Sequence, residues 1–247
     1  MAPSELKLSI VIPALNEADR IGDSLEELAA WLEDEAWLNS TEVIVVAATG
    51  KDQTAAEAKR HAGAFHHFKV VEPGPPVGKG RDVKVGMEAA SGQYRLFMDA
   101  DLATPLPHLK EAMTALEGGA DLVYGARDLW QMHEALSRKI ISVAGNLLIQ
   151  VVALPGIGDS QCGFKGFNWT TAAVCFDKQT LTGWGFDFEL FKIARVHKLK
   201  LHAVAINDWH DPKLGAGLVG ESNTVAMSRT LKELLKVRWQ AWRGAYR

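Results

Sequence analysis

The chain has 247 residues, of which 47% are apolar and 23% charged, and its net charge is about −3. This composition is ordinary for a globular protein with a buried core, and the charge gives no indication of a nucleic-acid partner. The two cysteines, Cys162 and Cys175, are too few for a disulfide framework or a metal-ligand set, so we expect reduced, buried thiols in a cytoplasmic protein.

The longest apolar run, residues 140–154, is about 15 residues long, whereas a bilayer span needs about 20. The first eight residues also lack the basic and apolar regions of a secretory leader. We therefore expect no membrane span, although attachment to a membrane surface stays open.

The first half of the chain alternates between short apolar runs and amphipathic segments. Residues 8–13 are apolar and β-branched and end near a proline, which predicts a buried parallel strand. Asn16 is predicted to cap the following helix. The further predicted elements are a helix with Ile21, Leu25, Leu28 and Leu32 on one face, strands at 42–47, 68–71 and 94–98, a helix at 52–64, a Pro/Gly loop at 73–80 and a helix at about 82–90.

This order predicts an α/β fold with a mostly parallel central sheet, right-handed crossovers and flanking helices. Ligands of such sheets bind beyond the carboxyl ends of the strands. Pro13, Ala47, Val71 and Asp99 all stand at those ends, so the first half has the layout of a nucleotide-binding protein.

The second half is less regular. We expect a strand at 122–125, helices at 138–154 and 183–198, a polar segment at 159–167 and an amphipathic helix from about residue 225. Because the sequence has no internal repeat, linker or low-complexity stretch, residues 1–247 are predicted to form a single domain.

Asp99-Ala100-Asp101 directly follows a predicted apolar strand. Two carboxylates one residue apart at a strand end can share a hard cation. Mg²⁺ prefers one or two carboxylates together with substrate phosphates, and a departing nucleoside diphosphate needs such a cation. An isolated Asp-x-Asp is often only a solvated turn, but its place after a strand and before Leu-Ala-Thr-Pro favours a metal and nucleotide site.

Several segments in order give the chain a resemblance to glycosyltransferase family 2. Within that family it looks most like the polyprenyl-phosphate branch, which contains dolichyl-phosphate glucosyltransferase and dolichol-phosphate mannose synthase. The resemblance implies the GT-A fold, which is Rossmann-like. The matching segments are Ile12-Pro13-Ala14-Leu15-Asn16-Glu17, Gly78-Lys79-Gly80, Asp99-Ala100-Asp101, Gly125-Ala126-Arg127, Arg138-Lys139, Asp159 to Lys165, and Trp184-Gly185-Phe186-Asp187.

The resemblance implies a role for each donor-site residue. Pro13, Leu15 and Glu17 would line the nucleoside pocket, with Glu17 near the ribose. Asp99 and Ala100 would contact the nucleotide.

It also implies the groups that handle metal and phosphate. Asp101 would hold Mg²⁺ or Mn²⁺. Arg127 and Arg138 match arginines near phosphate groups, and a guanidinium suits that role because it binds phosphate with two parallel hydrogen bonds. A surface ion pair is the alternative for each arginine.

The segment Gly78-Lys79-Gly80-Arg81 is expected in the loop before a helix, where exposed amides and two cations would favour a diphosphate. We therefore place Lys79 in the donor site, with a solvated basic turn as the alternative. The family usually has an acidic pair after the second strand, and this chain has Ala47-Ala48-Thr49-Gly50 instead. Recognition of the base must therefore differ, and the sequence leaves the base and the sugar of the donor open.

Four residues are candidates on the acceptor side. Asp187 and Glu189 lie at a predicted helix start, where an acid serves as general base in relatives with hydroxyl acceptors. A carboxylate that merely complements the helix dipole is the alternative. His210 and Lys213 lie in a glycine-rich segment that the resemblance implies to be an acceptor loop.

The tail combines basic and aromatic residues, which is typical of a helix at a membrane interface, although a helix packed on the domain is equally compatible. Its basic and apolar members are Arg229, Lys232, Lys236, Arg238, Arg243 and Arg247, and Leu231, Leu234, Leu235, Trp239 and Trp242.

We therefore expect an inverting glycosyltransferase that moves a hexose from a nucleotide-diphosphate sugar, UDP-glucose or GDP-mannose, to a polyprenyl phosphate. The alternatives are the same fold acting on a soluble hydroxyl acceptor, with Asp187 or Glu189 as base, and a non-catalytic nucleotide-binding module.

Overall fold

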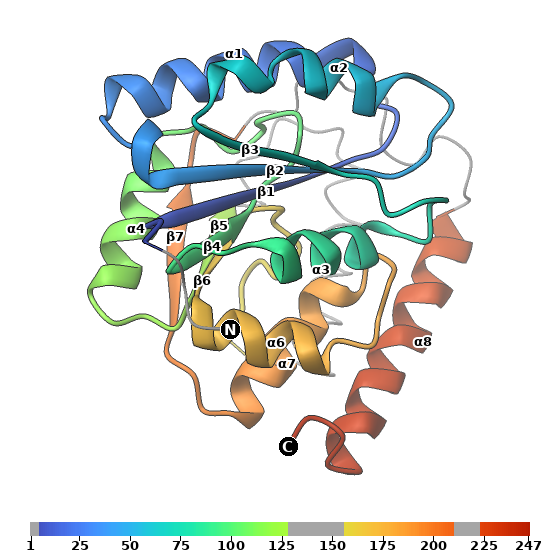
Figure 1. The fold of residues 1–247 in the computed structure, drawn as a ribbon. Helices are drawn as coiled ribbons and strands as arrows, with labels where there is room; N and C mark the ends of the chain where they lie inside the picture. Colours follow the sequence, from blue (N-terminus) through green and yellow to red (C-terminus); the bar gives the residue numbers. More distant parts are fainter. Residues whose placement is uncertain (1–4, 128–155, 210–222) are drawn as a thin grey trace.

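The computed structural model describes residues 5–127, 156–209 and 223–247 (Figure 1). Its centre is a seven-stranded sheet with strand order β3-β2-β1-β4-β6-β5-β7. Neighbouring strands are parallel, except that β6 runs antiparallel to both β4 and β5. The strands are β1 (Leu8–Ala14), β2 (Thr41–Ala47), β3 (His67–Val71), β4 (Tyr94–Phe97), β5 (Leu122–Arg127), β6 (Lys165–Asn168) and β7 (Leu201–Ile206).

Helices cover both faces of the sheet, as Figure 1 shows. Ile10 and Ile12 of β1 pack in the core cluster that contains α1 and α4, whereas Val11 packs with α3, α6, α7 and α8. Because successive side chains of a strand point to opposite faces, β1 contributes apolar side chains to the hydrophobic core on each side of the sheet. The helices are α1 (Ala18–Asp34), α2 (Thr54–Arg60), α3 (Lys79–Ala89), α4 (His108–Glu117), α6 (Trp169–Lys178), α7 (Phe186–Val196) and α8 (Asn223–Trp242).

The predicted mostly parallel sheet is confirmed, and all five strands expected from the sequence are present within a few residues of their predicted bounds. The apolar face predicted for the first helix is also confirmed, since Ile21, Leu25, Leu28 and Leu32 are fully buried in α1. Both cysteines are buried and unpaired, as expected. The prediction for residues 138–154 lies outside the described residues.

The sequence interpretation missed β6, β7, α4 and α6. Strand β6 was missed because it has the sequence Lys-Gly-Phe-Asn, in which a charged residue and a glycine interrupt the apolar pattern. Strand β7 is the edge strand of the sheet, and its first three residues are exposed or half-exposed, so its pattern is weak.

The predicted capping of α1 by Asn16 is wrong. The Asn16 side chain accepts a hydrogen bond from the backbone of Lys51, 2.6 Å away. The N–H groups at the start of α1 are instead satisfied from the loop after β2 and the first residue of α2. Ala18 N donates to Asp52 Oδ2 and Glu17 N donates to Thr54 Oγ1, each at 2.9 Å. A cap supplied from another element leaves no signal in the local sequence.

The predicted start of α3 near residue 82 is also wrong, because α3 begins at Lys79. Gly78 is the N-terminal boundary residue, with φ +146°, and Lys79, Gly80 and Arg81 form the first turn rather than a loop. Lys79 thus projects from a rigid helix start.

Helix α8 is packed on the domain along one side, with Leu234 and Val237 buried, and Tyr246, which follows the helix, is buried as well. Tyr246 donates its hydroxyl hydrogen to Glu189 Oε1 in α7 at 2.7 Å. The opposite side keeps large apolar residues exposed, among them Trp239 and Trp242. Helix α8 therefore combines features of both tail alternatives. In the part of the chain that the structure describes, no helix is both long and apolar enough to cross a bilayer.

Replacing Gly86 by alanine tests the packing of α3 against the sheet. Alanine favours helix over glycine by about 1 kcal/mol. The added Cβ, however, would lie 2.3 Å from Val11 Cγ1 and 2.7 Å from Val46 Cγ2, both fully buried. We expect Gly86→Ala to lower the free energy of unfolding by about 1–3 kcal/mol, measured by denaturant titration.

Gly63→Ala is the matched control, because a Cβ at Gly63 would meet nothing within 4 Å. It should leave stability unchanged or slightly raised. A Gly86→Ala protein as stable as the wild type would contradict the described contact between α3 and the sheet.

Candidate functional site

Three carboxylates gather at the carboxyl ends of β1 and β4. Asp99 and Asp101 follow β4, and Glu17 follows β1. The Asp99 side chain is 37% exposed, and that of Asp101 is 26% exposed. Asp101 Oδ1 accepts a hydrogen bond from Ala103 N at 3.1 Å, which fixes the turn after the strand. Asp99 thus lies beyond the carboxyl end of β4, as predicted, and ligand binding at this edge stays a prediction.

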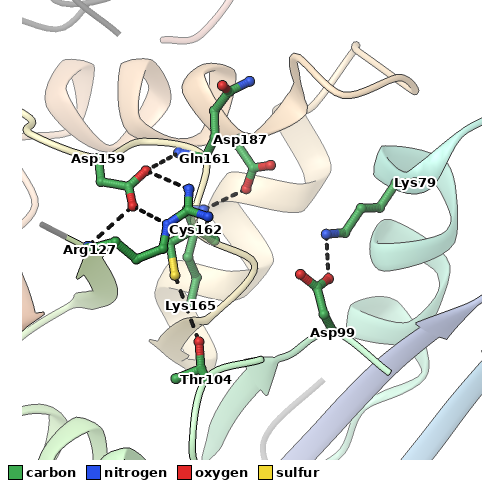
Figure 2. A network of polar contacts seen from close by, with 9 residues as sticks. All are labelled: Lys79, Asp99, Thr104, Arg127, Asp159, Gln161, Cys162, Lys165 and Asp187. Atoms are coloured by element: carbon green, nitrogen blue, oxygen red, sulfur yellow. Dashed lines mark hydrogen bonds and ion pairs between the residues drawn. The ribbon is translucent and has the colours of Figure 1, made fainter. Parts of the chain in front are cut away.

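Lys79 pairs with the first of these carboxylates, as Figure 2 shows. Burial alone would lower the pKa of Lys79, but the carboxylates of Asp99 and Asp187 outweigh it and hold the pKa above its usual value. On its other side Asp99 lies against Gly163, where an added Cβ would be 1.9 Å from Asp99 Oδ2. Lys79 and the backbone at Gly163 therefore hold Asp99 from two directions.

Arg20 links the other two carboxylates. Its Nε lies 2.8 Å from Glu17 Oε2, and its Nη1 lies 3.8 Å from Asp101 Oδ2. Burial, together with Asp99, raises the pKa of Asp101, and burial raises that of Glu17 although Arg20 opposes it. A hollow of about 390 Å³ between α1 and the segment 101–107 is lined in part by Arg20 and Asp101.

Arg127, at the end of β5, is held by Asp159. Its Nε and Nη2 lie 2.6 Å and 3.1 Å from the two carboxylate oxygens, and its backbone N–H adds a third contact (Figure 2). Burial alone would lower the pKa of Arg127, but the hydrogen bonds and charge of Asp159 raise it well above its usual value. The guanidinium also lies 5.2 Å from the Trp209 ring. Arg127 is thus fixed in orientation, with one edge of its fork used by Asp159.

A second buried pair, Lys165 with Asp187, lies beneath the acidic pair. Lys165 Nζ donates to Asp187 Oδ1 and to the Cys162 carbonyl, both at 2.6 Å, and both side chains are almost fully buried. The ammonium is 5.5 Å from the ring centroids of Phe97 and Phe191. Burial raises the pKa of Asp187, and Lys165 and Lys79 oppose that shift.

Glu189 is fully buried and accepts hydrogen bonds from four donors. Thr180 N and Leu181 N donate at 3.0 Å and 2.7 Å, and the hydroxyls of Thr180 and Tyr246 donate at 2.7 Å. These contacts fix the backbone at Thr180 and Leu181, and they occupy the lone pairs with which the carboxylate could accept a proton from a substrate. Glu189 therefore has a structural role here.

The residues expected around the nucleoside are brought only partly together. Leu15 is 39% exposed beside the loop after β2, and Pro13 is half-buried in β1. Ala100 is 4% exposed, and its carbonyl accepts a hydrogen bond from Ser24. Arg138, His210 and Lys213 lie outside the described residues, so the contacts expected of them stay predictions.

The structure adds Arg20, Asp159 and Lys165, for which sequence reasoning gave no role. Arg20 stands three residues after Glu17 in a predicted helix, a spacing that places both on one face. Lys165 interrupts the apolar run Cys-Gly-Phe-Lys-Gly-Phe, and such a lysine needs a buried partner. Asp159 lacked any local signal, because its partner is 32 residues away.

Within the described ranges no group of three or more His, Cys, Asp or Glu side chains could hold a metal. Asp99 and Asp101 remain, and burial together with the charge of Asp99 raises the pKa of Asp101. Two carboxylates match a divalent cation that takes its other ligands from phosphates and water. The donor set therefore fits Mg²⁺ or Mn²⁺ in the presence of a phosphorylated ligand.

Comparison with known proteins gives consistent results. The family model described as "Glycosyl transferase family 2" matches residues 9–170. The chain is 34% identical over 219 residues to the dolichyl-phosphate beta-glucosyltransferase of Drosophila melanogaster, covering 81% of this chain and 66% of that protein. It is 29% identical over 258 residues to the human protein of that name, covering 98% and 78%. The chain thus spans about two thirds of the fly relative and more of the human one.

Solved structures share the fold. Glucosyl-3-phosphoglycerate synthase from Mycobacterium tuberculosis, in complex with Mn²⁺, UDP and phosphoglyceric acid, matches with a TM-score of 0.64 and 20% identity, covering 94% of this chain and 78% of that one. Mannosyl-3-phosphoglycerate synthase from Rubrobacter xylanophilus matches with a TM-score of 0.69 and 18% identity, covering 97% and 76%. The predicted GT-A fold is confirmed.

Arg127→Lys tests the pair with Asp159. A lysine keeps the charge but cannot make two parallel hydrogen bonds to the carboxylate. Because the Asp159 side chain is 3% exposed, we expect the free energy of unfolding to fall by about 1–3 kcal/mol, measured by denaturant titration.

Arg60→Lys is the control, since the Arg60 side chain is 72% exposed in its pair with Glu57. It should change stability by less than about 0.5 kcal/mol. Equal effects of the two substitutions would show that the pair between Arg127 and Asp159 is no more than a surface contact.

Proposed function

Since this chain belongs to glycosyl transferase family 2, we propose that it transfers a hexose, with inversion, from UDP-glucose or GDP-mannose to a polyprenyl (dolichyl-type) monophosphate. The observation that carries this proposal is the combination of Asp99, Asp101 and Lys79 at one sheet edge. The names of the fly and human relatives support the acceptor. The chain is accordingly a glycosyltransferase rather than a non-catalytic nucleotide-binding module.

We propose that Asp101, with Asp99 beside it, holds Mg²⁺ or Mn²⁺ together with the donor diphosphate. The cation neutralises charge on the departing diphosphate when it is bound. Mn²⁺ accompanies UDP in the mycobacterial structure, which supports this assignment. Lys79 adds a second positive charge from the first turn of α3, where the helix dipole also favours an anion.

The remaining groups bind and orient the substrates. Pro13, Leu15, Glu17 and Ala100 are proposed to contact the nucleoside. Arg127 would orient the acceptor phosphate with the N–H groups that Asp159 leaves free. The segments outside the described residues would contribute Arg138, His210 and Lys213.

The environment of the two candidate bases favours a phosphate acceptor. Glu189 is fully used by four donors, and Asp187 is almost fully buried and paired with Lys165. A hydroxyl acceptor needs a base that removes its proton, whereas a phosphate monoester is already ionised near pH 7. Asp187 would then pair with Lys165 and hold Lys79 in its charged state rather than act as a base. The acceptor oxygen would attack the anomeric carbon directly.

A transfer assay tests the proposal. The protein is incubated with Mn²⁺, radiolabelled UDP-glucose or GDP-mannose, and either a polyprenyl phosphate in detergent or a set of soluble hydroxyl compounds. We expect label in the lipid fraction with one of the two donors. Label only in soluble products would favour the hydroxyl-acceptor alternative.

Asp101→Asn should abolish transfer, lowering the rate by at least about a hundredfold, because one metal-binding carboxylate becomes a neutral amide. It should also weaken Mn²⁺-dependent binding of the nucleoside diphosphate, measured by calorimetry. Asp23→Asn is the control, because Asp23 also lines the hollow but lies in α1 and not at the end of a strand. Turnover near wild type in the Asp101 variant would exclude the metal role.

We also propose that α8 places the enzyme on a membrane surface. At 3.6 residues per turn, Leu231, Leu235, Trp239 and Trp242 fall within an arc of roughly 80°, and they are 39%, 53%, 52% and 83% exposed. Exposed basic residues border this arc on both sides: Lys232, Lys236 and Arg243 on one, and Arg238 on the other. An apolar stripe edged by cations suits an anionic bilayer surface.

The protein should therefore sediment with anionic liposomes at low salt and be released at high salt, since each basic residue near the surface contributes about 1 kcal/mol that salt screens. Replacing Trp239 and Trp242 by alanine should lower the bound fraction and raise the KM for a lipid acceptor. These two substitutions are preferable to deleting the tail, because Tyr246 is part of the core.

Zwitterionic liposomes serve as the control surface. A wild-type protein that does not bind anionic liposomes at low salt would contradict attachment through α8, and it would strengthen the soluble-acceptor alternative.

A further inference from the structure

The segment between α6 and α7 is held rigidly against the start of α3. Gln179 Nε2 donates to the carbonyls of Gly80 and Leu181 at 2.9 Å and 2.7 Å, and Arg81 N donates to the Thr182 carbonyl at 3.1 Å. Glu189 holds the backbone of the same segment from α7. This segment is therefore a fixed part of the site wall.

The glycines on either side of Trp184 allow this close packing. A Cβ at Gly185 would lie 2.4 Å from Glu233 Oε2 of α8, and a Cβ at Gly183 would lie 3.2 Å from Glu233 Oε1. A Cβ at Gly80 would lie 2.9 Å from the Gly183 carbonyl. The backbone that carries Trp184 is thus enclosed between α3 and α8.

The Trp184 side chain is 53% exposed, although Phe186 and Phe188, which follow it, are fully buried. Its ring centroid is 5.3 Å from Lys79 Nζ, and that ammonium pairs with Asp99. A rigid, exposed indole therefore borders the charged centre proposed to bind the donor diphosphate.

We propose that Trp184 is the platform for the transferred hexose. A pyranose ring has polar edges and a face of C–H groups, and that face stacks on an aromatic ring, which offers a large, rigid apolar surface. The hexose is attached to the diphosphate that Asp101 and Lys79 are proposed to bind. It would therefore lie close to these two side chains and to the neighbouring Trp184 ring. This inference rests on the proposed function and assigns a sugar-contacting residue within it.

The test compares binding of UDP-glucose with binding of UDP, both with Mn²⁺, by calorimetry. In Trp184→Ala the Kd of UDP-glucose should rise about tenfold while that of UDP changes less than about twofold. Trp184→Phe keeps an aromatic face and should lose less. Trp169→Ala is the matched control, because Trp169 follows Asn168, which pairs with Tyr94 at the end of β4 opposite Asp99, and it should change neither Kd.

Equal weakening of both ligands in Trp184→Ala, or no weakening of either, would overturn the inference. A rise only in the KM for polyprenyl phosphate would assign the ring to the lipid and overturn it as well. Failure of the proposed function is distinguishable, because wild-type protein would then transfer no hexose to polyprenyl phosphate from either UDP-glucose or GDP-mannose.

Discussion

Repulsion between carboxylates at one edge of the sheet is the constraint on which the site depends. Glu17, Asp99 and Asp101 are brought together because β1 and β4 are adjacent parallel strands that end at the same edge. Arg20 bridges Glu17 and Asp101, while Lys79 holds Asp99. The arrangement leaves a partly exposed acidic pair beside a cation, which suits a metal–diphosphate complex.

The buried pairs behind this edge keep its geometry. The pair of Lys165 and Asp187 lies beside the pair of Lys79 and Asp99 (Figure 2), and Asp187 and Lys79 stabilise each other's charge. Glu189 connects the segment that carries Trp184 with Tyr246 near the end of the chain. The C-terminal tail is thereby linked to the segment that carries Trp184. The other side of α8 remains exposed, and it is the side proposed to contact a membrane surface.

Much of the fold was predictable from the sequence, because period-2 runs and helical spacing are local signals. They identified β1 to β5 and α1, and they placed Asp99 at the carboxyl edge of the sheet. The resemblance supplied candidate roles for Asp101, Lys79 and Arg127, and those roles remain proposals. The actual cap of α1, the partner of Arg127 and the pairing of Lys165 could not be predicted, because each depends on a contact between distant segments.

The central claim is that this site works by charge and orientation, with direct attack by an ionised acceptor. The configuration of the product formed from UDP-α-glucose and a polyprenyl phosphate tests this claim most directly, because a single displacement inverts the anomeric carbon. NMR of the purified glycolipid should show the β-anomer. An α-linked product would contradict the account, since retention requires a second displacement or a different mechanism.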